Sequence, residues 1–210
     1  MFVWGDSMAA SLMPGLRLLQ HELNFSLTQL TANSCGPVLS VNVPSSPSCR
    51  SNNDEILGVV SRTHPDIVLL HGRASTRPED LVGLKATVLA LRALSIPRVI
   101  VLGPLPVWKR GLPNEVLSYF VRHHVLIPER SSQRVYRLWD DAQMRSALTE
   151  VGAEYISAWD AMCDTDGCLT RLGDRPEDVT ASDQAHLTEN GSKFLIETIR
   201  DEIVPIEAAR

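Results

Sequence analysis

Two uninterrupted apolar runs, with a helical stretch between them, place the strongest constraint on how this chain can fold. The runs are Ile67-Val68-Leu69-Leu70 and Val99-Ile100-Val101-Leu102. A strand that is apolar on both faces is typical of the centre of a parallel sheet, where helices cover both sides. Between the runs, residues 78–94 carry leucine and valine at helical spacing. The three segments therefore predict a strand–helix–strand unit with a right-handed crossover.

The same alternation of strand and helix extends over the rest of the chain and indicates an α/β fold. Long loops are expected over residues 33–53 and 158–182, whereas residues 107–130 show no clear pattern. The other expected strands are 2–4, 25–32 and 154–157, and the other expected helices are 8–23 with an interruption at Pro14-Gly15, 54–63, 131–151 and 187–203.

Composition excludes several classes of protein. The 210 residues are 44 % hydrophobic and 21 % charged, as in ordinary globular domains. The net charge of −5 comes without a basic stripe, which argues against nucleic acid as a partner. No apolar run approaches the roughly 20 residues that cross a bilayer, and no basic segment of a signal peptide precedes the first strand. Because that strand begins almost at Met1, we expect a domain excised from a longer protein with more sequence upstream.

The cysteines indicate a cellular compartment if they form disulfides. The chain has four, Cys35, Cys49, Cys163 and Cys168, which allow three pairings. Pairing of sequence neighbours, Cys35 with Cys49 and Cys163 with Cys168, is the simplest choice and would indicate the periplasm or the cell exterior. The alternative is four reduced, buried thiols. Zinc is disfavoured, because the spacings are not Cys-x-x-Cys and no histidine pair follows at ligand distance.

A serine stands where the first strand turns into a helix. The strand runs into Gly5-Asp6-Ser7, and helix signals follow from Met8. A serine in such a turn lies at the carboxyl end of a strand and near a helix N-terminus. Open α/β sheets bind ligands there, and backbone N–H groups there stabilise an oxyanion. The alternative for Asp6 or Ser7 is an ordinary helix cap.

A second motif, Asp183-Gln184-Ala185-His186, supplies the groups that a serine nucleophile needs. Because Asp and His stand three residues apart, the carboxylate can hold one imidazole nitrogen while the other acts on a hydroxyl. We therefore predict Ser7 as the nucleophile, His186 as the general base and then acid, and Asp183 as the group that fixes the imidazole. The alternative for Asp183 is the N-cap of the last helix.

Together the two motifs resemble those of the SGNH (GDSL-type) hydrolase superfamily over residues 2–203. Its first block, Gly-Asp-Ser with a following Leu, is similar to Gly5-Asp6-Ser7 and Leu12, and its last block, Asp-x-x-His, is similar to Asp183 and His186. Within the superfamily the chain most resembles the extracytoplasmic domain fused to acyltransferase-3 membrane proteins, the sugar O-acetyltransferases. The segments that carry this narrower likeness are Ser34-Cys35-Gly36-Pro37, Cys49, residues 65–70, residues 101–106 and Cys163.

The resemblance implies a fold and an oxyanion hole. The fold is a single three-layer α/β/α domain over residues 1–210, with five parallel strands in the flavodoxin-like order 2-1-3-4-5. The oxyanion donors are the backbone N–H groups of Ser7 and Gly36. The third donor of the family, an Asn in a Gly-x-Asn-Asp block, is missing, because the chain has Gly72-Arg73-Ala74-Ser75 there. Arg73 and Ser75 are candidates to replace it; the alternative is that they are ordinary surface residues.

Sugar recognition is a hypothesis for Arg73, Ser75, Trp108 and Arg110. An aromatic face would stack on a sugar ring, and guanidinium groups would bind its hydroxyls. The alternative is that the charges are solvated in loops and that Trp108 packs inside the protein.

Three functions are compatible with these motifs. In the first, Ser7 accepts an acetyl group from an acyl donor, supplied by a fused or separate membrane acyltransferase, and passes it to a carbohydrate hydroxyl of a cell-surface polysaccharide. The second is an ester hydrolase that acts on carbohydrate or lipid esters, with water as the acceptor. The third is a non-catalytic carbohydrate-binding module. No cofactor is expected. The resemblance implies an extracytoplasmic location, periplasmic or at the cell surface, with a tether to a membrane domain.

Overall fold

The computed structural model describes residues 1–72 and 78–204. The chain divides into two compact units, each built from segments that are far apart in the sequence. The predicted nucleophile Ser7 belongs to the first unit, whereas Asp183 and His186 belong to the second. The first unit comprises Met1–Ala10, Asn24–Pro104 and Trp139–Ile156, and the second comprises Ser11–Leu23, Leu105–Leu138 and Ser157–Arg210.

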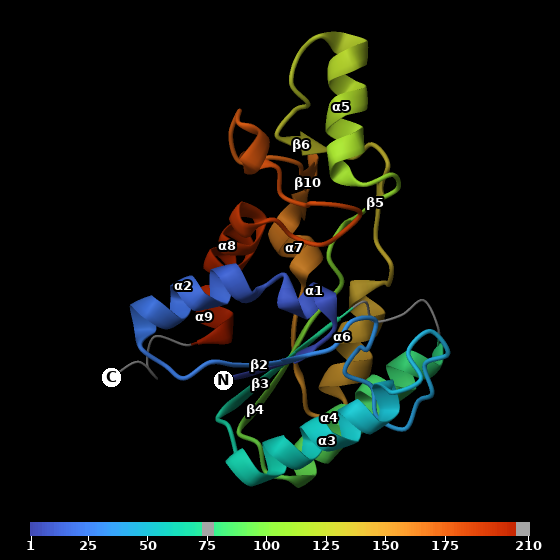
Figure 1. Cartoon of the computed structure of the whole chain (residues 1–210), viewed down its shortest axis with the longest axis vertical. Helices are drawn as coiled ribbons and strands as arrows, with labels where there is room; N and C mark the ends of the chain where they lie inside the picture. The colour runs from blue at the N-terminus through green and yellow to red at the C-terminus, as the bar shows by residue number, and fades with distance from the viewer. Residues whose placement is uncertain (73–77, 205–210) are drawn as a thin grey trace. The chain divides into compact units, whose positions relative to one another are not determined.

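A five-stranded sheet of order β2-β1-β3-β4-β8 forms the centre of the first unit (Figure 1). All of its neighbouring strands run parallel. Counted along the chain within this sheet, the order is 2-1-3-4-5, so the predicted α/β class and strand order are confirmed. The strands are β1 (Phe2–Gly5), β2 (Thr28–Thr31), β3 (Ile67–His71), β4 (Arg98–Leu102) and β8 (Glu154–Ile156).

Side chains on both faces of this sheet are buried. Successive strand residues point to opposite faces, so they form two sets. One set joins a single apolar core with helices α3 (Cys49–Thr63), α4 (Pro78–Ala93) and α6 (Asp141–Thr149). The intervening residues Val3, Leu69 and Ile100 are fully buried as well, so both faces of the sheet are covered. The strand residues of the first set are Phe2, Trp4, Val68, Leu70, Val99, Val101 and Tyr155.

The second unit is built from helices and short antiparallel strands. Helices α2 (Met13–Leu23) and α8 (Glu189–Thr198) pack against each other. They meet at Gly15, where a Cβ would lie 2.4 Å from the Ser192 carbonyl oxygen. The other elements of this unit are β5 (Val107–Trp108), α5 (Leu112–His123), β6 (Arg130–Ser131), β7 (Val135–Tyr136), α7 (Ala158–Met162), β9 (Cys163–Asp164), β10 (Gly167–Leu169), a short 3₁₀ helix (Pro176–Asp178) and α9 (Arg200–Ile203).

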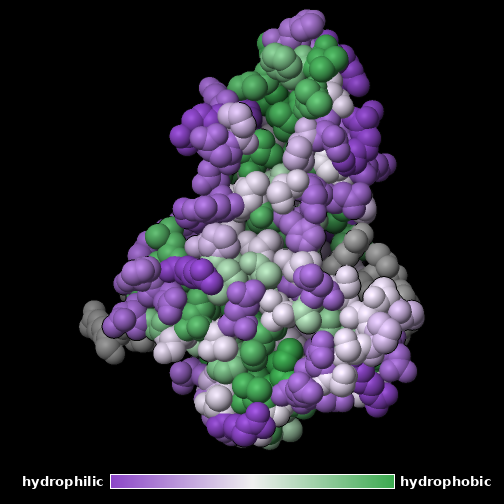
Figure 2. All heavy atoms as spheres, viewed as in Figure 1, coloured by the Kyte–Doolittle hydropathy of each residue, from purple (hydrophilic) through white to green (hydrophobic). Residues whose placement is uncertain are grey.

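Helix α5 occupies the segment whose pattern could not be interpreted from the sequence. Apolar side chains gather on the surface over this helix in Figure 2. Leu117, Phe120 and Val121 are exposed large apolar residues of α5. These residues recur at helical spacing, so the helix is amphipathic, but its apolar face lies on the surface instead of in the core.

The first predicted helix, residues 8–23, is interrupted at a different place from the one expected. Helix α1 (Ser7–Ala10) ends before Ser11, and α2 begins at Met13, so the break falls at Ser11-Leu12. Pro14 lies in the first turn of α2. A helix tolerates proline there, because the missing N–H would have no intrahelical acceptor in any case.

The predicted helix over residues 131–151 is wrong in its first half. Arg134 has a φ of 58°, in the left-handed region. The next two residues form β7, which pairs antiparallel with β5. Helix α6 begins only after Asp140, whose side chain accepts a hydrogen bond from the Gln143 N–H at 2.9 Å.

Other boundaries differ by smaller amounts. Helix α3 begins at Cys49 instead of residue 54, and β2 covers only Thr28–Thr31. The closing helix begins at Glu189 after its N-cap Thr188 and is split at Ile199 into α8 and α9. The expected loop over residues 158–182 contains α7, β9 and β10.

Both predicted disulfides are present. Cys35 and Cys49 are joined with an S–S distance of 2.04 Å, and Cys163 and Cys168 with one of 2.07 Å. The first disulfide links the segment after β2 to the first residue of α3. It therefore fixes the start of a helix that the sequence pattern alone would begin later.

We expect the Cys35–Cys49 disulfide to stabilise the fold. It joins residues 14 apart, and a loop of this size corresponds to about 3 kcal/mol in the chain-entropy treatment. The double variant Cys35→Ala/Cys49→Ala should lose about this much free energy of unfolding in urea titrations. The matched control is Cys163→Ala/Cys168→Ala, which opens a loop of separation 5 and should lose less. Equal losses in the two variants would contradict the prediction.

Candidate functional site

The turn that carries Ser7 depends on a glycine. Strand β1 ends at Gly5, and α1 begins at Ser7. A Cβ at position 5 would lie 1.6 Å from the His71 carbonyl oxygen of β3 and 2.7 Å from the Ala9 Cβ. Only glycine fits such a close approach of two strands and a helix. The turn therefore lies at the carboxyl end of the sheet beside the β1–β3 switch in strand order, which is where doubly wound sheets bind ligands.

Asp6 holds this turn from inside the protein. Its side chain is buried, and its Oδ1 accepts a hydrogen bond from the Met8 N–H at 2.8 Å. Gly72 lies against it, since a Cβ there would be 3.2 Å from Asp6 Oδ2. Asp6 thus caps the short helix α1 and fixes the backbone on both sides of Ser7.

Gly36 follows the neighbouring strand at the same edge of the sheet. The Ala32 N–H donates to the Gly5 carbonyl oxygen at 3.1 Å, and the Cys35 N–H donates to the Ala32 carbonyl oxygen at 3.1 Å. These bonds place the Gly36 turn beside the end of β1. Within residues 1–72 and 78–204, the Gly36 N–H makes no hydrogen bond.

Asn53 of α3 fixes the Gly36 segment to β1, and the sequence analysis missed it. The side chain is fully buried. Its Oδ1 accepts a hydrogen bond from Trp4 Nε1 at 2.9 Å, and its Nδ2 donates to the carbonyl oxygens of Gly36 and Val38, each at 2.9 Å. No sequence signal marked it, because Asn53 stands at the end of a loop-like stretch rich in Ser, Pro and Asn.

Thr87 of α4 holds the next residues of the same segment. Its buried hydroxyl accepts a hydrogen bond from the Leu39 N–H at 3.1 Å and lies 2.8 Å from the Pro37 carbonyl oxygen. The backbone after Gly36 is therefore anchored to both α3 and α4.

Asp183 and His186 form the other half of the predicted site, in the second unit. His186 Nδ1 lies 2.6 Å from Asp183 Oδ2. The other carboxylate oxygen, Oδ1, accepts the backbone N–H groups of Ala185 and His186 at 2.9 and 2.8 Å. Since a carboxylate only accepts, Nδ1 carries the proton, and the lone pair of the neutral ring lies on Nε2. Helix α8 is capped by Thr188 and not by Asp183, so the helix-cap alternative for Asp183 is wrong.

The half-exposed Asp183 carboxyl is held in its charged form. Burial raises its pKa, but the hydrogen bonds from the backbone of Ala185 and His186 and from the His186 ring lower it by more, so the pKa lies below its ordinary value. A carboxylate that stays ionised keeps the imidazole in one tautomer and one orientation.

Backbone hydrogen bonds hold the loop of this pair to the start of α5. The Leu112 N–H donates to the Asp183 carbonyl oxygen at 2.9 Å, and the Trp108 N–H donates to the Gln184 carbonyl oxygen at 2.8 Å. The loop is therefore ordered even though it contains no helix or strand.

The structure places the proposed sugar-binding residues in different environments or does not describe them. Arg73 and Ser75 lie outside the described residues. Trp108 is only 2 % exposed, so its burial favours the alternative of a packing side chain. Arg110 makes a paired contact with Glu115, with Nε 3.2 Å from Oε1 and Nη2 3.3 Å from Oε2.

Two further features of the described part of the chain bear on the site. In residues 1–72 and 78–204, no group of three or more His, Cys, Asp and Glu side chains is arranged to hold a metal ion. Over the same ranges, no helix has the length and apolar character that a membrane crossing needs.

His71, at the end of β3, is buried and neutral. It is 2 % exposed, and its Nδ1–H donates to the Leu102 carbonyl oxygen at 3.0 Å. Burial lowers the pKa of His71, although the Leu102 carbonyl and the charge of Asp6 act to raise it. In the part of the chain that the structure describes, its Nε2 has no hydrogen-bond partner. A proton on Nε2 would therefore put a positive charge in the core with no hydrogen-bond acceptor among the described residues.

We expect Asn53→Ala to destabilise the protein. The substitution leaves Trp4 Nε1 and two backbone carbonyls without their partner, at a cost of about 3 kcal/mol. Asn52→Ala is the matched control one residue earlier in α3, where the side chain is only partly buried. It should change the free energy of unfolding by less than about 0.5 kcal/mol. Similar losses in the two variants, measured in urea, would exclude the buried network as the cause.

Acid should weaken the fold through His71. Because its pKa is lower in the folded than in the unfolded chain, its contribution to stability is complete above about pH 6.5 and is lost as the pH falls from there toward the folded value. His71→Asn keeps a donor near Nδ1 but cannot take up a proton. The free energy of unfolding should therefore fall less between pH 7.5 and pH 5 in this variant than in the wild type. Parallel pH profiles would refute the assignment.

Comparison with known proteins shows the family of the chain. Residues 1–201 match the family model described as the SGNH domain (fused to AT3 domains). The chain is similar to the solved periplasmic domain of the Salmonella ser. Paratyphi A lipopolysaccharide acetyltransferase, with 26 % sequence identity, a TM-score of 0.85, and coverage of 97 % of this chain and 83 % of that chain. No curated protein matches the chain. A family match over so much of the sequence shows that the chain belongs to the SGNH domain family described as fused to AT3 domains.

Proposed function

We propose that this protein transfers an acetyl group, through an ester on Ser7, to a carbohydrate hydroxyl of a cell-surface polysaccharide. The observation that carries the proposal is the 2.6 Å contact between His186 Nδ1 and Asp183 Oδ2, in a chain of the SGNH family that has a serine at its first strand–helix turn. The solved relative is a lipopolysaccharide acetyltransferase, which supports transfer to a glycan.

In the first half of the reaction, His186 activates the serine. His186 Nε2 takes the proton of the Ser7 hydroxyl while Ser7 Oγ attacks the carbonyl carbon of the acyl donor. The N–H groups of Ser7 and Gly36 stabilise the oxyanion that forms. When the intermediate collapses, the bond to the leaving group breaks, and His186 returns the proton to that group. The acetyl ester of Ser7 remains.

In the second half, a sugar hydroxyl takes the place of the leaving group. His186 removes its proton, the hydroxyl oxygen attacks the ester carbonyl, and Ser7 leaves and regains the proton from His186. The product is an O-acetylated sugar. Water in place of the sugar would give an ester hydrolase by the same steps, so exclusion of water at this stage separates the two activities.

The proposal includes a location and a source of the acetyl group. On this proposal a fused or separate membrane acyltransferase supplies the acyl donor, and the fusion of the family to AT3 domains supports this source. The two disulfides and the periplasmic relative support an extracytoplasmic location for the whole domain, residues 1–210, tethered to such a membrane domain.

We expect Ser7→Ala to abolish release of acetate from p-nitrophenyl acetate. Asp183→Asn should lower the rate by about 10⁴, as loss of the orienting carboxylate does in serine triads. Ser51→Ala, which changes an exposed serine of α3, is the matched control and should keep the wild-type rate. O-acetylated product that appears only when a polysaccharide acceptor is added would support transfer over hydrolysis.

Other outcomes would change the assignment. Acetate release that is the same with and without acceptor would support the hydrolase. If the wild type and Ser7→Ala are equally inert with both donor and acceptor present, the isolated domain is not a catalyst, and either the binding module or a transferase that acts only with its membrane partner would replace the proposed function.

A further inference from the structure

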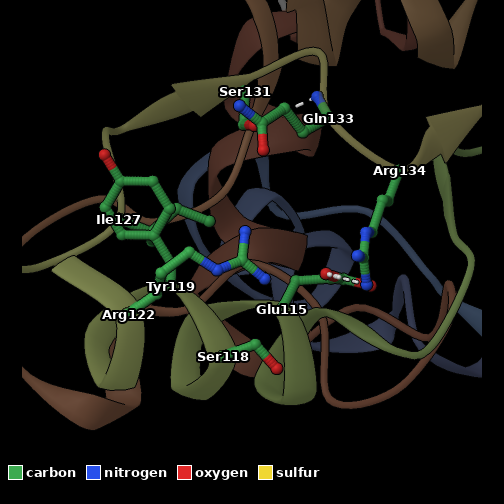
Figure 3. Close-up of a pocket in the computed structure, with 8 residues that line it drawn as sticks. All are labelled: Glu115, Ser118, Tyr119, Arg122, Ile127, Ser131, Gln133 and Arg134. Carbon is green, nitrogen blue, oxygen red and sulfur yellow. Dashed lines mark hydrogen bonds and ion pairs between the residues drawn. The ribbon is translucent and has the colours of Figure 1, made fainter.

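A groove with a mostly polar lining lies along one face of α5, in the second unit (Figure 3). Helix α5 contributes Glu115, Ser118, Tyr119 and Arg122 to it. These residues are spaced i, i+3, i+4 and i+7, so they share one face of the helix. Gln133 and Arg134, from the segment between β6 and β7, line the opposite side.

The charged side chains that line the groove differ in whether they have a partner of opposite charge. Glu115 is buried, and its carboxylate is already occupied by Arg110 at 3.2 Å and Arg134 at 3.7 Å. Arg122 is exposed and makes neither a hydrogen bond nor an ion pair with any described residue. One carboxylate and two guanidinium groups line the groove, which leaves one positive charge in a protein whose net charge is −5.

The groove also offers contacts that suit a sugar. Figure 3 shows the Arg122 guanidinium extending across the groove between Tyr119 and Glu115. Tyr119 contributes an aromatic ring, which also packs against the His123 ring with centroids 4.3 Å apart, and such rings pack on the apolar face of a ligand. Gln133 adds an amide, which can both donate and accept. The planar Arg122 guanidinium, which has no partner among residues 1–72 and 78–204, matches the two oxygens of a carboxylate or phosphate.

The groove is connected to the loop of the catalytic histidine through the backbone. The first residue of α5, Leu112, donates its N–H to the Asp183 carbonyl oxygen at 2.9 Å. Arg122 stands ten positions farther along α5, which corresponds to about 15 Å of helix. A glycan bound along this face would therefore extend from the Asp183 loop toward Arg122.

We propose that the α5 groove binds an anionic sugar unit of the acceptor glycan, with its carboxylate or phosphate on Arg122. The inference rests on the proposed function, because it assumes a carbohydrate acceptor. It adds to that function an acidic substituent on the acceptor and a binding site apart from the reacting groups.

The test is direct binding to the whole domain carrying Ser7→Ala, which cannot form the ester, measured by calorimetry. The probes are trigalacturonic acid, its fully methyl-esterified form, and mannose 6-phosphate. We expect one of the two anionic probes to bind, with the carboxylate and phosphate arms distinguishing the two sources of charge. Arg122→Gln should weaken that binding at least tenfold, and Gln133→Ala should weaken it independently. Removing the charge of trigalacturonic acid by esterification should have an effect similar to that of Arg122→Gln.

Arg62→Gln is the matched control, because Arg62 is also an exposed arginine in the last turn of a helix, α3. It should leave binding unchanged, and thermal unfolding should verify that all variants are folded. The proposal is overturned if neither anionic probe binds, or if Arg122→Gln and Arg62→Gln have the same effect. Since binding is measured without the nucleophile, absence of acetyl transfer in the wild type would refute the proposed function and leave the result on the groove standing.

Discussion

At Gly5 the backbone of β1 passes so close to β3 that a side chain would collide with the His71 carbonyl oxygen at 1.6 Å. Strand β1 pairs with both β2 and β3, so any separation at this point would disturb the centre of the sheet. The same close approach brings the ends of three strands together. Asp6, Ser7 and the Gly36 turn therefore lie at one edge of the sheet, where the strand order reverses.

The parts of the fold that could be predicted from the sequence are those set by local pattern. The continuous apolar runs of β3 and β4 can be buried only between two layers, and Cys35 and Cys49 flank a single loop. The resemblance supplied the strand order, and the sheet confirms it. The helix expected over residues 131–151 failed because long-range pairing between β5 and β7 and the left-handed Arg134 override the local propensity.

Within the candidate site, the sequence allows prediction of the residues that carry a chemical signature but not of those that support them. Asp183 and His186 are recognisable because their spacing matches a chemical task. Asn53 is not, because its role comes from three hydrogen bonds to segments distant in the sequence. Trp108 is the opposite case. An aromatic residue in a predicted loop suggested a sugar-stacking ring, but Trp108 lies in β5, which pairs with β7, and it is buried. No local sequence pattern indicates that burial.

Asp183 contacts both the His186 ring and the start of α5, through separate atoms. Its two carboxylate oxygens hold the His186 ring and the turn around it, while its backbone carbonyl oxygen accepts the N–H of Leu112 at the start of α5. A shift of α5 would therefore change the backbone at the residue that orients the imidazole. On the binding proposed above, a glycan in the α5 groove would restrain that helix, and its effect would reach the His186 turn through this hydrogen bond.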